Sequence, residues 1–290
     1  MTSGAQMAPT GLERIAEAFA RARANGRRAA LMPYLMGGFP DLDTSREIGL
    51  AYARGGADLV ELGVPFSDPL ADGPIIHAAA TAALRAGSTL PAVLAVGQEI
   101  ARHVPVVVMC YANPIIIRGL ERFLDSLVGI GASGLIVPDL PREESRDCAA
   151  GCAQRGLALV PLVAPTTPDA RLAEIGADAQ GFIYAISFTG TTGERAQSSE
   201  GTEAIGRVVS RAAARTEVPV AVGFGIGTPE QAAGAAAAGA DGVIIGSRLV
   251  RAAGEAANPA AEVEALVRGF AVALSQGQRG SGERSAAPRR

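Results

Sequence analysis

Apolar residues recur along the chain in short, nearly continuous runs that alternate with longer stretches of helical spacing. Runs rich in Val, Ile, Leu and Ala are typical of parallel strands that are covered on both faces. An amphipathic helix at 12–23, ending near Asn25-Gly26, precedes the first of these runs. We count eight runs, at 30–36, 58–64, 104–111, 134–138, 158–164, 181–187, 218–224 and 242–245.

Eight strand–helix units in about 250 residues predict an α/β fold, a single (β/α)8 TIM barrel with an extra N-terminal helix. A doubly wound sheet is the structural rival, and two small sheets are a more remote one. No low-complexity linker divides the chain. We therefore expect one barrel domain at 12–275, between a disordered N-terminal tail at 1–11 and a disordered C-terminal tail at 276–290.

The basic residues change the picture, because all 26 of them are arginine. Schiff-base chemistry needs a lysine amine, so the sequence excludes it, together with covalent attachment of pyridoxal phosphate. The two histidines, His77 and His103, lack the spacing of a metal site, and no metal is expected. An enzyme built from this chain must carry out its proton transfers with carboxylates.

Charge and cysteine content limit the partners and the compartment. The net charge of −3 leaves no basic surface for nucleic acid. The first ten residues lack a charged region followed by an apolar core, and no apolar run approaches about 18 residues. Three cysteines, Cys110, Cys148 and Cys152, are too few for a disulfide framework. We expect a soluble, cytoplasmic protein without a membrane partner, in which Cys148 and Cys152 are packed residues rather than a thiol pair.

One apolar run, at 58–64, has a carboxylate in its middle, Glu61. Glutamate is almost never fully buried unless something compensates it, and catalytic groups of a TIM barrel lie at the C-terminal ends of its strands. Asp72 follows in the next loop, just before Gly73-Pro74. A helix cap or a turn is an equal alternative for Asp68, whereas Glu61 has no comparable structural reason.

Glycine-rich loops follow the seventh and eighth runs, as GFGIGTP at 223–229 and GSR at 246–248. In TIM barrels the loops after strands seven and eight frequently bind phosphate with their backbone N–H groups. The first loop lacks the third glycine of a dinucleotide fingerprint. These loops favour a phosphorylated substrate, and tight turns are the structural alternative.

The residues from Glu61 to Pro74, ELGVPFSDPLADGP, resemble the signature of the tryptophan synthase alpha chain family. Further pieces agree in order, and the resemblance runs from about residue 12 to about residue 275. These pieces are MPYL at 32–35, YANP at 111–114, VPDLP at 137–141 with EES at 143–145, TTG at 191–193, GFGI at 223–226 and IGS at 245–247.

The resemblance implies cleavage of indole-3-glycerol phosphate to indole and glyceraldehyde 3-phosphate, a retro-aldol reaction without cofactor or metal. This agrees with the missing lysines. By resemblance, Glu61 is the acid and base, and Asp72 accepts the indole N–H. Two carboxyl groups with these roles need different environments. Burial is expected to raise the pKa of Glu61 toward neutrality, while the loop keeps Asp72 ionised.

The resemblance also implies binding residues. Around the indole ring they are Tyr34, Met109, Ile136, Tyr184 and Phe224, and at the phosphate they are Gly193, Gly225, Gly246 and Ser247. Thr192 matches a threonine that helps to close the site and to orient Asp72. The implied partner is a tryptophan synthase beta chain, which contains pyridoxal phosphate (PLP), in an alpha2-beta2 complex. Positions that match its interface are Asp68, Asn113, Asp139 and Pro141.

One loop departs from the family pattern, since SFTGTTG stands at 187–193 where SRxGVTG is usual. The change puts loop closure and coupling to a beta chain in question, but it leaves both carboxylates in place. Three interpretations follow: an alpha subunit activated by its partner, a stand-alone lyase that releases free indole, and a non-catalytic activating subunit. A different phosphosugar lyase or isomerase on the same barrel is a remoter option.

Overall fold

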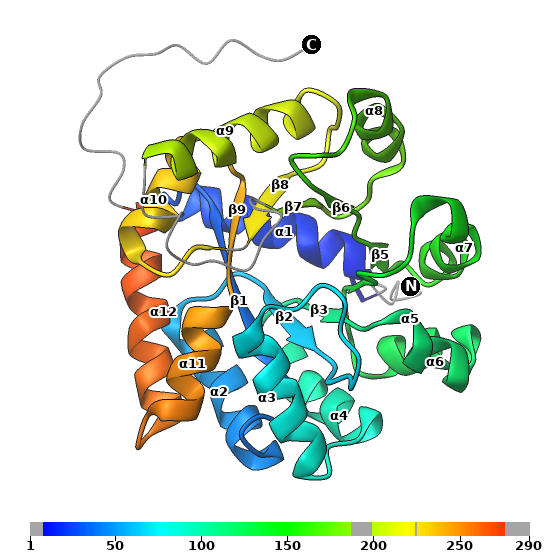
Figure 1. Cartoon of the computed structure of the whole chain (residues 1–290), viewed down its shortest axis with the longest axis vertical. Coiled ribbons are helices and arrows are strands. Elements are labelled where there is room, and N and C mark those ends of the chain that lie inside the picture. The colour runs from blue at the N-terminus through cyan, green and yellow to red at the C-terminus, as the bar shows by residue number, and fades with distance from the viewer. Residues whose placement is uncertain (1–7, 187–198, 224, 276–290) are drawn as a thin grey trace, which may run out of the picture.

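The computed structural model describes residues 8–186, 199–223 and 225–275, without the side chains of 199–202 (Figure 1). Its strands are all parallel and form one sheet in the order β5-β4-β3-β2-β1-β9-β8-β7-β6. The strands are β1 (Ala30–Met36), β2 (Val60–Gly63), β3 (Val106–Met109), β4 (Gly134–Ile136), β5 (Ala158–Leu159), β6 (Leu162–Val163), β7 (Ile183–Ile186), β8 (Val220–Gly223) and β9 (Gly242–Ile245).

The fifth predicted run accounts for both edge strands of this sheet. β5 pairs with β4, and β6 pairs with β7, and only Val160 and Pro161 separate β5 from β6. Proline has no N–H to donate, which breaks the ladder at this point. Because both edges belong to one segment, the sheet curls round to meet itself. The predicted TIM barrel is therefore confirmed, with one strand interrupted.

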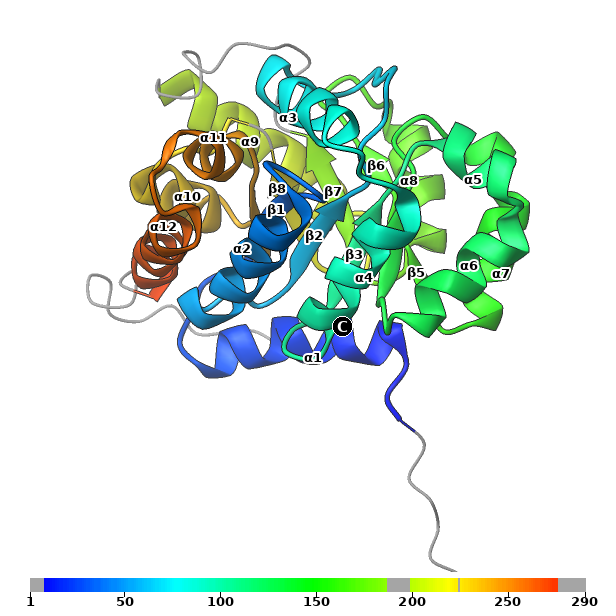
Figure 2. The ribbon, with the colours of Figure 1, turned by 90° about the horizontal axis from the view of Figure 1, so that it is seen from below.

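Helices surround the sheet and connect successive strands (Figure 1, Figure 2). Two of the connections hold a pair of helices, divided at Gly87 and at Gly119, where φ is positive and glycine is favoured. The helices around the sheet are α2 (Leu42–Gly55), α3 (Pro74–Arg85), α4 (Leu90–Ala101), α5 (Ala112–Arg118), α6 (Leu120–Gly129), the 3₁₀ turn η1 (Arg142–Glu144), α7 (Arg146–Gln154), α8 (Asp169–Asp178), α9 (Ser199–Ala213), α10 (Pro229–Ala237), α11 (Ser247–Glu255) and α12 (Pro259–Ser275).

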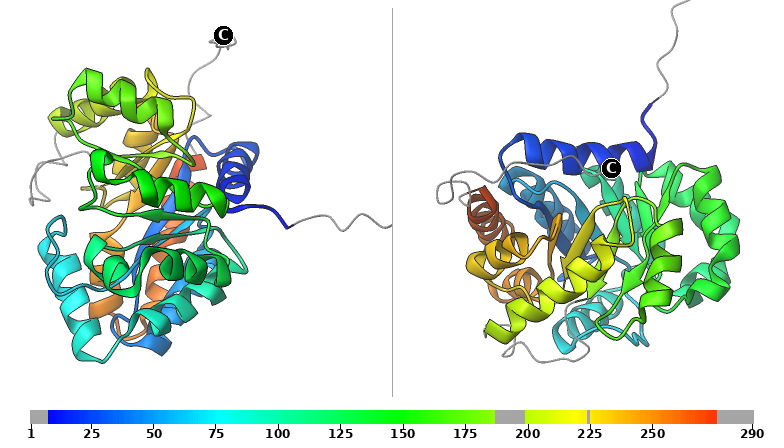
Figure 3. Two further views of the ribbon diagram at one scale, coloured as in Figure 1. Left: turned by 90° about the vertical axis from the view of Figure 1, so that its right-hand side faces the viewer. Right: turned by 90° about the horizontal axis from the view of Figure 1, so that it is seen from above.

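The leading helix α1 (Gly11–Ala24) lies across the end of the barrel at which the strands begin (Figure 2, Figure 3). Thr10 and Glu13 cap it reciprocally. Its buried face contributes Ile15 and Phe19 to the core of the barrel, where the rings of Phe19 and Phe182 lie 5.9 Å apart. The helix thus closes this end of the barrel.

Alternation along the strands divides the buried residues into two layers. In β1, Ala30 and Met32 belong to the barrel interior, whereas Leu31 and Leu35 pack against the surrounding helices. In the β2 segment, Leu59 belongs to the barrel interior, whereas Val60 and Leu62 face the helices. A strand side chain two positions from an interior residue shares its face, so position 61 points into the barrel.

In the described part of the chain, no single helix is long and apolar enough to cross a membrane, although the bent pair α3 and α4 together passes that test by length and composition. Residues 1–7 and 276–290 lie outside the described residues. The predicted tails and the domain boundaries of 12 and 275 therefore stay predictions.

Candidate active site

Glu61 occupies the interior of the barrel near the C-terminal end of β2. The residue is 2% exposed, and its Oε2 atom has no hydrogen-bond partner. Burial, reinforced by the charge of Asp72, raises the pKa of Glu61 from 4.5 to about 8. An uncompensated buried carboxyl group retains its proton near neutral pH, which is what a general acid requires. The sequence-based expectation of a raised pKa agrees with this geometry.

Asp72 lies in the loop between β2 and α3 and is half-buried. The hydroxyl group of Tyr111 donates a hydrogen bond of 3.1 Å to its Oδ1 atom. Burial raises the pKa of Asp72 above its usual value, and the Tyr111 hydrogen bond and the charge of the nearby His77 offset part of this rise. At Glu61, burial and the charge of Asp72 both raise the pKa, so the two carboxyl groups lie in different environments.

Tyr111 is a site residue whose role the sequence did not reveal. Its hydroxyl oxygen also accepts a hydrogen bond of 3.1 Å from the N–H of Ala71, next to Asp72. The ring stacks on Phe66, with 5.2 Å between ring centroids. Tyr111 therefore ties the loop after β2 to the end of β3. Its signals in the sequence were its position at the end of the apolar run 104–111 and its place in the YANP piece at 111–114, and neither indicated this contact.

Two buried tyrosines also belong to the site, Tyr34 in β1 beside the strand of Glu61 and Tyr184 in β7, which is not a neighbour of that strand. The charges of Glu61 and Asp72 add to the effect of burial in raising the pKa of both phenols. Each hydroxyl group lies over a strand glycine. A Cβ atom at Gly63 would be 2.0 Å from the Tyr34 hydroxyl oxygen, and one at Gly223 would be 2.4 Å from that of Tyr184. These glycines make room for the tyrosines, a function the sequence analysis missed.

The remaining residues predicted around the ring and the phosphate lie at the C-terminal ends of neighbouring strands. Met109 ends β3 and is half-buried, and Ile136 ends β4 and is fully buried. Gly225 follows β8 with a φ of +78°, a conformation that favours glycine. Gly246 and Ser247 follow the paired strand β9, and they form the N-terminus of α11.

Part of the predicted site lies outside the described residues. Thr192, Gly193 and Phe224 belong to this part, as does the whole departing loop at 187–193. Their predicted roles therefore stay predictions.

The predicted interface residues follow three adjacent strands, β2, β3 and β4. Asp68, Asn113 and Pro141 are exposed. Asp139 is half-buried and accepts a 2.9 Å hydrogen bond from the N–H of Ala112 at the start of α5. Large apolar side chains are exposed after two of these strands: Leu70, at 85%, in the loop after β2, and Ile116, at 73%, and Ile117, at 78%, in α5.

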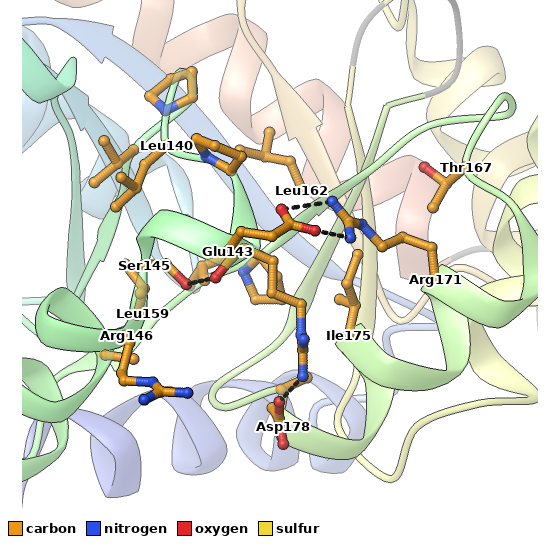
Figure 4. A pocket seen from close by; sticks show the side chains of 18 of the residues that line it. Leu140, Glu143, Ser145, Arg146, Leu159, Leu162, Thr167, Arg171, Ile175 and Asp178 are labelled. Carbon is orange, nitrogen blue, oxygen red and sulfur yellow. Dashed lines mark hydrogen bonds and ion pairs between the residues drawn. The ribbon is translucent and has the colours of Figure 1, made fainter.

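A separate cavity of about 1050 Å³ lies between α7 and α8 (Figure 4). Apolar residues, among them Leu140 and Ile175, line it, and ion pairs cross it. Arg171 pairs with Glu143, and Arg142 pairs with Asp178. These pairs join η1 to α8. Their side chains are too exposed to contribute much stability.

Within the described residues, no group of three or more His, Cys, Asp or Glu side chains could hold a metal ion. Cys110, Cys148 and Cys152 are all buried and free. The site therefore consists of carboxyl and hydroxyl groups in an apolar barrel mouth, flanked by backbone N–H groups.

A family model for the tryptophan synthase alpha chain matches residues 19–276. The chain belongs to the tryptophan synthase alpha chain family. The Synechococcus elongatus tryptophan synthase alpha chain is 48% identical over 239 residues, which are 81% of this chain and 88% of that protein. The Methanosarcina mazei protein of the same name is 44% identical over 242 residues, 83% of this chain and 88% of its own.

Solved structures agree with this family assignment. Mycobacterium tuberculosis tryptophan synthase superposes with a TM-score of 0.84 at 38% identity, covering 91% of this chain and 99% of that one. The Legionella pneumophila tryptophan synthase alpha chain gives a TM-score of 0.82 at 30% identity, with 94% and 100% coverage. The family, the TIM-barrel fold and the lyase activity predicted from the sequence are thereby confirmed.

Proposed function

We propose that this tryptophan synthase alpha chain cleaves indole-3-glycerol phosphate to indole and glyceraldehyde 3-phosphate with Glu61 as both acid and base. The observation that supports this assignment is the isolated carboxyl group of Glu61, which is 2% exposed, has an unbonded Oε2 atom and has its pKa raised to about 8. At neutral pH such a group still carries the proton that the first step consumes.

The reaction needs two proton transfers, one from the Glu61 carboxyl group to the substrate and one from the substrate back to Glu61. Glu61 donates its proton to C3 of the indole ring, which leaves a positively charged ring and a carboxylate. The carboxylate then removes the proton of the hydroxyl group on the carbon attached to C3. The O–H electron pair becomes the carbonyl bond of the aldehyde, and the electrons of the breaking carbon–carbon bond neutralise the ring.

Asp72 stabilises the ring charge between these two steps. A carboxylate that accepts the indole N–H strengthens its interaction as the ring becomes positive, so it favours the intermediate over the substrate. Tyr111 is a positioning residue for this group, since its 3.1 Å hydrogen bond fixes Oδ1 and offsets part of the rise in the pKa of Asp72 that burial causes.

The phosphate of the substrate binds at the loops after β8 and β9. At the start of α11, Gly246 and Ser247 place backbone N–H groups and the positive end of the helix dipole at the barrel mouth. Gly225 follows the neighbouring strand. The substrate then spans the mouth from this anchor to Glu61. Gly193 and Thr192 complete the proposed site.

We further propose that the chain works with a tryptophan synthase beta chain, in an alpha2-beta2 complex whose PLP is held by the beta chain. The interface comprises Asp68, Asn113, Asp139 and Pro141. It is supported by the exposed Leu70 in the loop after β2 and the exposed Ile116 and Ile117 in α5, which follows β3, because exposed large apolar side chains are typical of interaction surfaces. The sequence holds no lysine to bind PLP itself.

The deciding experiment mixes the purified chain with indole-3-glycerol phosphate and follows the fluorescence of released indole. The chain contains no tryptophan, so its own signal does not interfere. Glu61→Gln serves as the blank. Slow, Glu61-dependent release that rises when a beta chain is added supports the proposal. Fast release without a partner supports the stand-alone lyase. Equal rates for wild type and Glu61→Gln would refute the role of Glu61. No release of indole, with or without a beta chain, would support the non-catalytic subunit.

We also propose that the chain works in the cytoplasm, as its sequence predicts. Cell fractionation followed by immunoblotting tests this location. Recovery in the soluble fraction of broken cells, and not in a periplasmic extract, is the expected result, and recovery in the periplasmic extract would contradict it.

A further inference from the structure

Two buried polar atoms at the mouth of the barrel lack a hydrogen-bond partner. They are Oε2 of Glu61 and the hydroxyl oxygen of Tyr34, and their residues are 2% and 4% exposed. A buried polar group without a partner costs free energy, so each such group in a native protein requires a reason. The hydroxyl group of Tyr184, on the opposite side, is not among the unpartnered atoms.

The two orphan groups lie on adjacent strands. Tyr34 in β1 pairs in register with Glu61 in β2. The Tyr34 hydroxyl group lies over Gly63, since a Cβ atom there would be 2.0 Å from it. Gly63 is two positions after Glu61 and shares its face of the sheet. The absence of a side chain at Gly63 thus allows the hydroxyl group of Tyr34 to approach the catalytic carboxyl group from the neighbouring strand.

The chemistry of the two groups is complementary. An ionised carboxyl group only accepts hydrogen bonds, and a phenol donates one. A single aliphatic hydroxyl group can donate to the first and accept from the second at the same time. On the proposed function, the substrate brings such a hydroxyl group to Glu61, namely the one that becomes the aldehyde oxygen.

We propose that Tyr34 is a further catalytic residue, whose hydroxyl group donates a hydrogen bond to the substrate oxygen that Glu61 deprotonates. This inference rests on the proposed function. As Glu61 takes the proton, negative charge develops on that oxygen until the carbon–carbon bond breaks. A fixed donor in a water-poor site stabilises such charge without reorganisation. No proton leaves Tyr34, whose phenol stays protonated because burial raises its pKa well above the usual value.

The test is Tyr34→Phe in the full-length chain, which removes one oxygen atom and keeps the ring. Loss of a comparable donor lowers kcat by on the order of 10²-fold, and we expect a fall of this size with KM changed by less than about threefold. Ser133→Ala is the matched control. Its hydroxyl oxygen is also buried without a hydrogen-bond partner, but it lies beside Gly11 of α1, at the opposite end of the barrel. Its kcat is expected to stay within about twofold of wild type.

A second measurement separates catalysis from structural damage. An indole-propyl phosphate that lacks the reacting hydroxyl group should inhibit wild type and Tyr34→Phe with the same inhibition constant. Unchanged kcat in Tyr34→Phe, or weaker binding of this analogue, would overturn the inference. Glu61→Gln, assayed in parallel, keeps the two proposals apart: if it is inactive while Tyr34→Phe is not, the proposed function holds and the role of Tyr34 fails.

Discussion

The hydroxyl group of Tyr111 joins Asp72 across two adjacent strand ends, by a hydrogen bond of 3.1 Å to the Oδ1 atom. The same hydroxyl oxygen accepts the N–H of Ala71, so one side chain fixes both the carboxylate and the backbone beside it. The loop that carries Asp72 is therefore held by a residue that follows β3.

Tyr111→Phe is expected to lower kcat/KM for indole release about tenfold at neutral pH, since a hydrogen bond to a charged group contributes about 1.5 kcal/mol. The stacking on Phe66 is retained. The loss of kcat/KM should grow as the pH falls. The Tyr111 hydroxyl group holds the pKa of Asp72 lower than burial alone would, so in the variant the Asp72 carboxylate becomes protonated at a higher pH than in wild type. A pH series of kcat/KM checks this. A loss that is the same at every pH would show that Tyr111 acts only through packing.

Glu61 should make the folded chain less stable as the pH rises. Its pKa is raised from 4.5 to about 8, so above pH 4.5 the unfolded chain loses this proton while the folded chain keeps it. The contribution of Glu61 to the free energy of unfolding is fully present below pH 4.5, and it falls by up to about 1.4 kcal/mol for each pH unit until about pH 8. Glu61→Gln lacks this loss. Urea unfolding of both proteins at pH 5 and pH 8 should show the variant gaining relative to wild type, and a constant difference would contradict the raised pKa.

Gly63→Ala is expected to impair catalysis more than folding. The new methyl group would be 2.0 Å from the Tyr34 hydroxyl oxygen and must displace the ring beside Glu61. Misplacement by about 1 Å can cost up to about 100-fold in rate. Gly269→Ala is the control, since its Cβ atom meets nothing within 4 Å and alanine favours the helix by about 1 kcal/mol. Indole release and circular dichroism of both variants measure the effects. Full activity in Gly63→Ala would show that the ring has another place to go.

Ile116→Asp should weaken binding to a beta chain at least about tenfold without changing the slow cleavage by the chain alone. Ile116 is 73% exposed, and burying a charge in an interface costs more than burying an apolar side chain. Val272→Asp, at a site 48% exposed on α12, provides the control. Titration of each variant with the beta chain gives its Kd. Equal Kd values for the two variants would show that Ile116 lies outside the interface.

The fold was predictable because parallel strands that are buried on both faces have nearly continuous apolar sequences. The run at 30–36 coincides with β1. In the fifth run, Pro161 was a signal that the strand divides, because proline cannot donate to a ladder, although apolar residues continue on both sides of it. The sequence alone does not show that the two halves pair with different strands, β4 and β7, because those partners are far away in the chain.

The candidate site was predictable only in part, for a similar reason. Glu61 stood out because a charge interrupts an apolar run. Tyr111 and Asp72 are 39 positions apart, and only the pairing of β2 with β3 brings them together. The role of Gly63 did have a signal, because alternation places it on the face of Glu61, but the ring that needs its space comes from another strand.

The position of α1 also has a consequence for traffic through the site. With that helix covering the end where the strands begin, the described part of the barrel opens at the end where the strands finish. The loops after β2, β3 and β4 border that opening on one side, and the loops after β8 and β9 border it on the other. A protein bound to the first three loops would therefore cover part of the mouth, on the path by which the apolar product leaves Glu61.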